Sequence, residues 1–188
     1  MLPPMPRAAV TPRLSFVLAA PADAPTVAAI LTAASDALTA RFGRGHWSHA
    51  TSERGVLATM KRGGDVWIAR RGRTPVGTWT LATRKPWAID RAYFDASSAR
   101  PRYLTGMAVR PESQGLGIGR RCLEHAAVAC RAAGGDAIRL DAYDAVAGAG
   151  EFYARCGYRE VGRVTYRKVP LVYYELLLGR DGAGDGGA

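Results

Sequence analysis

A glycine-rich segment at residues 114–120, Gln-Gly-Leu-Gly-Ile-Gly-Arg, has the residue types that point most directly to chemistry. Glycines at alternate positions let successive backbone N–H groups turn toward one point, and a helix that follows adds the positive end of its dipole. This pattern predicts a cradle for a pyrophosphate. It does not fit a nucleotide motif. A Walker loop needs Lys-Ser or Lys-Thr, which the chain lacks, and the GxGxxG fingerprint needs glycine where Arg120 stands.

The elements on either side of this segment predict how it is held. Residues 103–109 read as a strand, residues 117–133 as a helix, and residues 137–143 as a second strand. The apolar stripe of the helix consists of Ile118, Cys122, Leu123, Ala126, Ala127 and Cys130. A strand, helix, strand order of this kind is a right-handed crossover, so we expect the two strands to run parallel.

The rest of the chain predicts a single mixed α/β domain over residues 13–178. Residues 1–12 and 179–188 are rich in Pro or Gly and are expected to be mobile tails. Further strands are expected at residues 13–20, 65–70, 75–82, 158–166 and 171–178, and further helices at 23–40, 48–61 and 148–156. Asp23 is expected to cap the first helix. Residues 83–101 show no period and read as a functional loop.

Two motifs resemble those of the GNAT superfamily of CoA-dependent N-acetyltransferases, in particular its small bacterial members. The first is Met107–Pro111 followed by Gln114, Gly117 and Gly119, which is similar to a strand ending in Val-x-Pro and a [Q/R]-x-x-G-x-[G/A] loop. The second is the segment 151–158, EFYARCGY, which is similar to the family's FYxxxG[FY] stretch. The resemblance is most specific over residues 102–160. It implies a mixed, mainly antiparallel seven-stranded sheet with a splayed parallel strand pair, flanked by about four helices.

The resemblance also implies the roles of individual residues. Acetyl-CoA would be the co-substrate, with its pantetheine arm along Met107, Ala108 and Val109 and its thioester carbonyl polarised by an N–H there. Main-chain N–H groups would hold the pyrophosphate, and the residues concerned are Gln114, Gly115, Leu116, Gly117, Ile118, Gly119 and Arg120. Tyr153 would be the general acid that protonates the leaving thiolate. The implied activity is acetyl transfer to a primary amine of a small molecule or peptide, by direct attack in a ternary complex.

Two departures from the family pattern leave the general base open. Many relatives carry a Glu on the strand at residues 103–109, which has no acid here, so Asp141, Asp144, His49 or ordered water are the alternatives. Val146 stands where the family often has Asn, and Asp144 is a candidate for the missing helix cap. These departures motivate an alternative function, a catalytically degenerate protein that binds an acyl-CoA as a sensor or regulator.

Several residues keep both a functional and a structural interpretation. Gly106 either lets a ligand approach closely or marks a bulge, and Asp141 could pair with Arg139. Substrate contacts are expected from residues 41–48, 83–101 and 166–174, with Trp47, Trp87, Tyr93 and Tyr166 either walling an aromatic pocket or packing in the core.

Composition limits the expected partners and compartment. The net charge of +10 is the difference between 26 Lys+Arg and 16 Asp+Glu. The basic residues are spread along the whole chain, without the signatures of a nucleic-acid-binding module. No apolar run is long enough to span a membrane. Cys122, Cys130 and Cys156 have neither a disulfide-framework nor a zinc-site spacing, so we expect a cytoplasmic protein without a metal. The sequence leaves open whether the protein forms a homodimer.

Overall fold

The computed structural model describes residues 13–179, so the predicted tails lie outside the described residues except for Gly179. Its strands are β1 (Leu14–Leu18), β2 (Gly64–Arg71), β3 (Thr74–Ala82), β4 (Pro101–Val109), β5 (Ala137–Tyr143), β6 (Arg159–Tyr166) and β7 (Val169–Leu177). Its α-helices are α1 (Ala24–Phe42), α2 (Glu53–Lys61), α3 (Ile118–Ala132) and α4 (Gly150–Arg155). The strands form one sheet in the order β1-β2-β3-β4-β5-β7-β6, in which β4 and β5 are parallel and the other neighbours antiparallel. The predicted fold class is confirmed.

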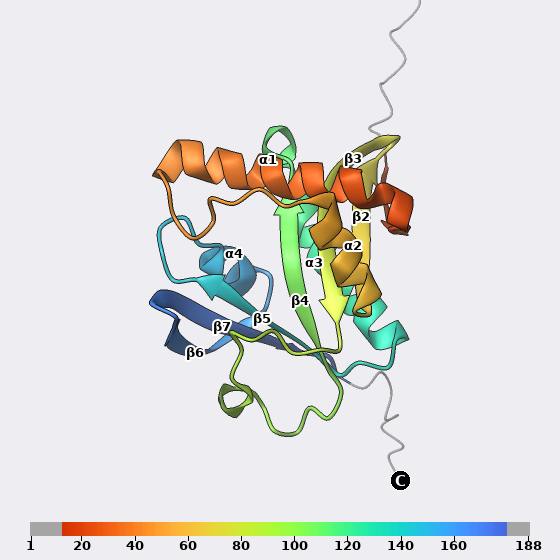
Figure 1. Ribbon diagram of the computed structural model, residues 1–188. Coiled ribbons are helices and arrows are strands. Elements are labelled where there is room, and N and C mark those ends of the chain that lie inside the picture. The colour runs from red at the N-terminus through yellow and green to blue at the C-terminus, as the bar shows by residue number, and fades with distance from the viewer. Residues whose placement is uncertain (1–12, 180–188) are drawn as a thin grey trace, which may run out of the picture.

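Helices cover both faces of this sheet (Figure 1). α1 and α2 lie on one face, where Val27, Val56 and Ile68 share a buried cluster. α3 lies on the other face, and the six residues of its predicted stripe are all buried. The loop that joins β3 to β4 extends beyond the lower end of the sheet in Figure 1 and contains a short 3-10 turn, Arg91–Tyr93.

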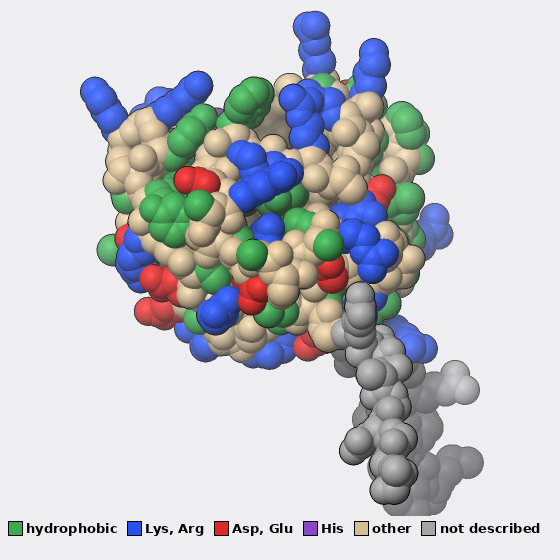
Figure 2. All heavy atoms as spheres, turned by 90° about the horizontal axis from the view of Figure 1, so that it is seen from below, with side chains coloured by type: hydrophobic (Ala, Val, Ile, Leu, Met, Phe, Trp, Pro, Cys, Tyr) green, Lys and Arg blue, Asp and Glu red, His purple; other side chains and the backbone are tan. Residues whose placement is uncertain are grey.

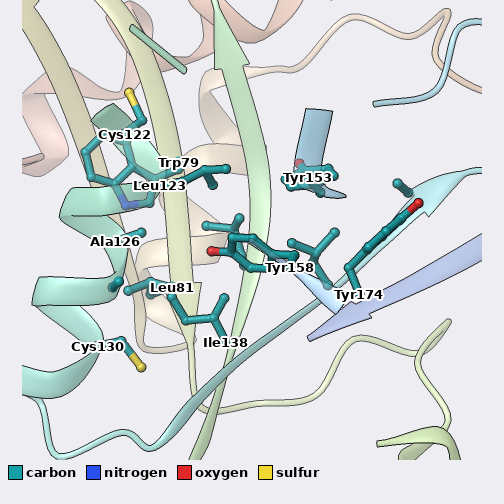
Figure 3. Close-up of a cluster of buried hydrophobic side chains, with 14 of the residues drawn as sticks. Trp79, Leu81, Cys122, Leu123, Ala126, Cys130, Ile138, Tyr153, Tyr158 and Tyr174 are labelled. Atoms are coloured by element: carbon teal, nitrogen blue, oxygen red, sulfur yellow. The ribbon is translucent and has the colours of Figure 1, made fainter. Parts of the chain in front are cut away.

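The largest buried cluster joins α3, the sheet and α4. Figure 3 shows Leu123 and Ala126 of α3 on one side of this cluster and three tyrosines on the other. The ring of Tyr153 lies 5.8 Å from that of Tyr158 and 5.9 Å from that of Tyr174, measured between centroids. Aromatic packing of this kind stabilises both the position and the orientation of the rings. It fixes α4 against the C-terminal hairpin.

β4 and β5 are paired at one end only. Pro101–Tyr103 pair with Ala137–Arg139, and beyond this point the two strands make no ladder with each other. β4 stays paired with β3 as far as Val109, and β5 stays paired with β7 over its whole length. Each strand is therefore held by its outer neighbour, and the pair opens as a V.

Gly106 marks a bulge in the open arm of β4. The register with β3 shifts between Thr78 and Thr80, and Gly106 has a φ of 57°. A Cβ on Gly106 would meet its first atom only at 3.8 Å, so glycine is needed here for its backbone angle and not for space. Gly106 therefore marks a bulge, and the close approach of a ligand at this residue stays a prediction.

One helix start and one capping contact differ from the sequence prediction. α2 begins at Glu53 rather than near residue 48, because the Ser52 hydroxyl accepts a hydrogen bond from the backbone N–H of Gly55 and caps the helix there. Asp23 is the N-cap residue of α1, as predicted, but its side chain makes no capping hydrogen bond there. Its carboxylate accepts a hydrogen bond from the backbone N–H of Ala20 and pairs with Arg70.

A buried ion pair holds the closed end of the V. The Arg139 Nε of β5 donates to the Glu175 carboxylate of β7 at 2.9 Å, and their side chains are 5% and 0% exposed. The exposed Arg159 reaches the same carboxylate at 3.4 Å. Arg139 therefore pairs with Glu175 and not with Asp141, a pairing that the sequence had left as one alternative.

We predict that Glu175→Leu lowers the free energy of unfolding by about 3–5 kcal/mol, because it leaves the Arg139 guanidinium buried without its counter-charge. Urea denaturation measures this change. Arg159→Ala should lower the free energy of unfolding by less than about 1 kcal/mol, because the Arg159 side chain is exposed. The double variant Arg139→Met with Glu175→Leu should recover at least half of the loss, and a double variant as unstable as Glu175→Leu alone would contradict this interpretation.

Candidate active site

Two glycines shape the loop between β4 and α3. Gly115 and Gly117 have φ angles of 74° and 73°, which other residues adopt only with strain. The Gln114 side-chain amide donates to the Val109 carbonyl at 3.0 Å and fastens the loop to the end of β4. The first N–H groups of α3 have no acceptor within the helix and carry the positive end of its dipole. The loop can therefore hold an anion at the start of α3.

Gly119 is glycine for a different reason. It lies within α3, and a Cβ there would come within 3.0 Å of the Phe152 ring. Gly117, by contrast, has no atom within 4 Å of its Cβ position. The missing side chain at Gly119 lets α4 pack against α3, and the missing side chain at Gly117 leaves the space in front of the loop open.

This loop borders a cavity of about 650 Å³, which we call the cradle cavity. All the predicted cofactor-binding residues line it except Leu116, whose side chain is 58% exposed and is not part of the lining. Those that line it are Met107, Ala108, Val109, Gln114, Gly115, Gly117, Ile118, Gly119 and Arg120. A volume of this size suits a small organic ligand.

Several lining residues were not predicted from the sequence. They are Ala34, Leu38, Ser113, Ala147, Ala149, Phe152, Arg155 and Cys156. The Arg120 guanidinium donates to the Arg155 carbonyl at 2.8 Å, which joins the start of α3 to the end of α4. Phe152 and Arg155 flank Tyr153 in the sequence and could have been found from that motif. No sequence signal placed α1 at the cavity.

A second cavity of about 350 Å³ lies in the open part of the V, and we call it the gap cavity. Thr105–Ala108 of β4 and Asp141–Tyr143 of β5 face it from the two strands. The two cavities share Ala34, Leu38, Met107, Ala108, Ala147, Ala149 and Tyr153, so they meet. Tyr153 is therefore located where a ligand in one cavity would meet a ligand in the other.

Tyr153 is positioned by α4 and is 7% exposed. Burial raises the pKa of its phenol well above the ordinary value, and the charge of Asp141 adds to this effect. The phenol therefore keeps its proton at every pH at which the protein would work. A group in that state can donate a proton but cannot act as a base.

The three candidate bases have different surroundings. Asp141 lines the gap cavity, and burial raises the pKa of its carboxyl. His49 lines the same cavity. Asp144 does not line it, because both of its oxygens bind the Arg163 guanidinium, at 2.8 and 2.9 Å. Asp144 does not cap α4 either, since the N-cap position is Ala149 without a side-chain bond. Of the three side chains, Asp141 and His49 remain candidates, beside ordered water.

One of the four predicted aromatic wall residues, Trp47, lines the gap cavity. Its ring lies 6.1 Å from that of Tyr143, and the Tyr143 hydroxyl donates to the His46 carbonyl at 2.9 Å. Trp87 is 82% exposed, and neither Tyr93 nor Tyr166 is part of the gap-cavity lining. The segment after α1 therefore forms the aromatic wall.

Val146 is 89% exposed, so its side chain makes little contact with the described residues. Within residues 13–179, no group of three or more His, Cys, Asp or Glu is placed to bind a metal ion. No helix in the same range has both the length and the apolar character needed to cross a membrane.

The chain belongs to the acetyltransferase (GNAT) family, whose family model matches residues 31–158. That match contains every residue that lines the cradle cavity or the gap cavity. A search of curated proteins found no significant match.

Solved structures with the same fold include three acetyltransferases. An acetyltransferase of the GNAT family from Streptococcus agalactiae has a TM-score of 0.72 at 14% identity, covering 91% of this chain and 99% of its own. The ribosomal-protein-S18-alanine N-acetyltransferase of Escherichia coli has a TM-score of 0.66 at 16% identity, covering 91% and 97%. The yncA protein of Salmonella typhimurium, solved with its cofactor acetyl-CoA, has a TM-score of 0.63 at 17% identity, covering 93% and 99%.

We predict that a thiol reagent labels Cys156 first. Cys122 and Cys130 are fully buried, and burial raises the pKa of their thiols to about 12 and about 11. Cys156 is partly exposed in the cradle cavity, and burial raises its pKa less. Its reaction should be slower than that of a free thiol and should accelerate with pH, because only the thiolate reacts.

Mass spectrometry of the intact native protein and of its peptides identifies the labelled cysteine. Cys156→Ser should abolish the fast labelling. Equal labelling of Cys122 in the folded protein would contradict the packing of α3 against the sheet.

Proposed function

We propose that the protein is an N-acetyltransferase that transfers the acetyl group of acetyl-CoA to a primary amine of a small molecule or peptide, by direct attack in a ternary complex. The observation that carries this proposal is the position of Tyr153, where the cradle cavity meets the gap cavity. Acetyl-CoA, when bound, supplies a thioester whose acyl carbon an amine can attack.

The residues of the cradle cavity fit acetyl-CoA. The open space at the Gly117 Cβ position and the free N–H groups at the start of α3 suit the pyrophosphate. The open arm of β4, which includes Met107, Ala108 and Val109, has no strand partner on the side of β5. Its backbone groups would pair with the amide groups of the pantetheine arm, as another strand would. An N–H at Ala108 or Val109 would polarise the thioester carbonyl.

Tyr153 would act as the general acid. The attack forms a C–N bond and breaks a C–S bond, and the leaving thiolate needs a proton. The Tyr153 phenol keeps its proton and lines both cavities, and this position supports its role as the donor. The acetyl group would then lie between the two cavities, with the thiol on the side of the cradle loop.

Asp141 would act as the general base. An amine is protonated in water and must lose a proton before it attacks. The Asp141 carboxyl lines the gap cavity, has no salt bridge among the described residues, and has a pKa that burial raises above its ordinary value. A carboxylate with these properties would attract an ammonium group and accept its proton. His49 is the second candidate, since it lines the same cavity.

The amine substrate would occupy the gap cavity between the strands and the segment after α1. Trp47 and Tyr143 form an aromatic wall there, and Asp141 provides the one acidic side chain of the lining. A compact amine with an apolar or aromatic body fits these features better than a polyamine, which would need several acids.

The alternative function is a sensor that binds an acyl-CoA without turnover. It uses the same cradle cavity and is motivated by the lack of an acid on β4. Acetyl-CoA binding without thiol release across a broad panel of amines would favour it.

We predict that acetyl-CoA stabilises the protein and that Gly117→Ala weakens its binding by about tenfold or more. A ligand at 100 times its Kd adds about 2.7 kcal/mol of stability. The added methyl group would enter the space in front of the loop and strain its backbone. Thermal melts and calorimetric titration measure the stability and the affinity.

Gly63→Ala is the matched control, because Gly63 also has a positive φ (81°) and open space but lies at the end of α2. Both variants should lose about 1 kcal/mol of stability, and only Gly117→Ala should lose affinity. Equal affinities would remove the cradle loop from the binding site.

We predict that Tyr153→Phe lowers kcat by about 100-fold or more with little change in the affinity for acetyl-CoA, because it removes the proton donor alone. Thiol release from acetyl-CoA with an accepted amine measures the rate. Full activity of this variant would exclude Tyr153 as the acid.

We predict that kcat/KM falls as the pH decreases through the raised pKa of Asp141, since the protonated carboxyl cannot accept a proton. The raised pKa of Tyr153 should cause no loss of rate up to about pH 10. Asp141→Asn should lower kcat/KM and remove this dependence on pH. If Asp141→Asn leaves the pH profile unchanged, Asp141 is not the general base, and His49 becomes the candidate for that role.

A further inference from the structure

A third cavity, of about 640 Å³, lies at the opposite end of β4 from the cradle loop, and we call it the arginine cavity. Its walls come from residues 91–103, from Arg139 of β5, and from Ala133 and Gly134 at the end of α3. It shares no lining residue with the cradle cavity or the gap cavity. A ligand there would be separate from both substrates of the proposed reaction.

The lining of the arginine cavity is strongly positive. It contains four guanidinium groups, those of Arg91, Arg100, Arg102 and Arg139, and one carboxylate, that of Asp95. Glu175 neutralises Arg139. Arg91 and Arg100 are exposed and have no salt bridge among residues 13–179. Figure 2 looks onto this end of the molecule and shows Lys and Arg side chains across the face, with Asp and Glu scattered between them.

The walls of the cavity are held by a network of polar contacts. Asp136 accepts hydrogen bonds from the Ser98 hydroxyl and from the backbone N–H groups of Ala99 and Arg100, at 2.7–3.1 Å. The Arg139 guanidinium donates to the Asp95 carbonyl at 2.7 Å and lies over the Phe94 ring at 4.9 Å. The site is therefore built before any ligand arrives, which lowers the entropy cost of binding.

The Arg102 guanidinium also supports this wall, since it donates to the Ala133 carbonyl at 2.9 Å. Arg91 and Arg100 have no such structural contact and remain available to a ligand. They are the side chains that can be changed without disturbing the fold.

The inner part of the cavity is apolar, and one of its lining residues carries a buried hydroxyl without a partner among the described residues. Phe94 and Tyr103 are buried, and Pro101 and several alanines complete the lining. Tyr103 is 1% exposed, and its hydroxyl has no hydrogen-bond partner among the described residues. Buried hydroxyls are ordinarily paired, because leaving one unpaired costs stability.

We propose that the arginine cavity is a second ligand site, which binds a small organic oxyanion, a phosphate ester or carboxylate on a compact apolar body. The oxyanion contacts Arg91 and Arg100 at the mouth, where bidentate contacts with guanidinium groups are strong. The apolar body lies against Phe94 and Tyr103. The site also adjoins the last paired residues of the V, because Tyr103 and Arg139 are register partners in β4 and β5.

The test is an NMR titration of the full-length ¹⁵N-labelled chain with phenyl phosphate, repeated with benzoate, inorganic phosphate and phenol. We expect phenyl phosphate or benzoate to bind with a submillimolar Kd and to shift the resonances of residues 91–103 and 133–139. Whichever of the two binds more tightly identifies the oxyanion. Inorganic phosphate and phenol should each bind at least tenfold more weakly, because inorganic phosphate lacks the apolar body and phenol lacks the oxyanion.

Two variants locate the binding. Arg91→Ala with Arg100→Ala should weaken the binding of the tighter probe at least tenfold, whereas Arg73→Ala, an exposed arginine in the β2–β3 turn, should leave it unchanged.

The proposal is overturned if neither phenyl phosphate nor benzoate shifts these resonances at 10 times the expected Kd. It is also overturned if the shifts map to residues 107–120, if the double arginine variant binds as tightly as the parent, or if inorganic phosphate binds as tightly as phenyl phosphate. Gly117→Ala should not alter the result, so failure of this proposal and failure of the acetyl-CoA site are distinguishable.

Discussion

The hydrogen bonds that β4 and β5 do not make with each other determine the geometry of the site. Backbone N–H and C=O groups need partners, and a strand edge inside a sheet normally finds them in its neighbour. Here the ladder stops after Tyr103 and Arg139, while β3 and β7 hold the two strands from outside. The result is an edge of peptide groups along an open gap. An extended ligand with amide groups can satisfy that edge as a strand would, and this is the basis of our proposal that acetyl-CoA binds here.

The closed end of the V has to be rigid for the open end to keep its shape. The buried Arg139–Glu175 pair ties β5 to β7 directly beside the last paired residues. The same guanidinium and Asp136 hold the loop between β3 and β4 against the sheet. One network thus supports the junction of the V and the walls of the arginine cavity. The proposed active site and the proposed second ligand site share this junction, although they share no lining residue.

Local signals made much of the fold and part of the site predictable from the sequence. The apolar period of α3, the glycines of the cradle loop and the position of Tyr153 depend on nearby residues, and each appears in the structure where expected. Features set by long-range contacts were missed. Asp144 is bound by Arg163, nineteen positions away, and Ala34 of α1 reaches the cradle cavity only through tertiary packing. The arginine cavity is formed by a loop without a period, which no sequence pattern could place.

A crystal structure of the protein with acetyl-CoA tests the central claim most directly, because it shows what binds along the open arm of β4, where the cradle cavity meets the gap cavity. The account predicts a pantetheine arm hydrogen-bonded to the backbone of Met107–Val109, a pyrophosphate at residues 115–120, and a thioester sulfur within hydrogen-bond reach of the Tyr153 hydroxyl. Acetyl-CoA bound elsewhere, or a sulfur remote from Tyr153 with the V closed by a β4–β5 ladder, would contradict it.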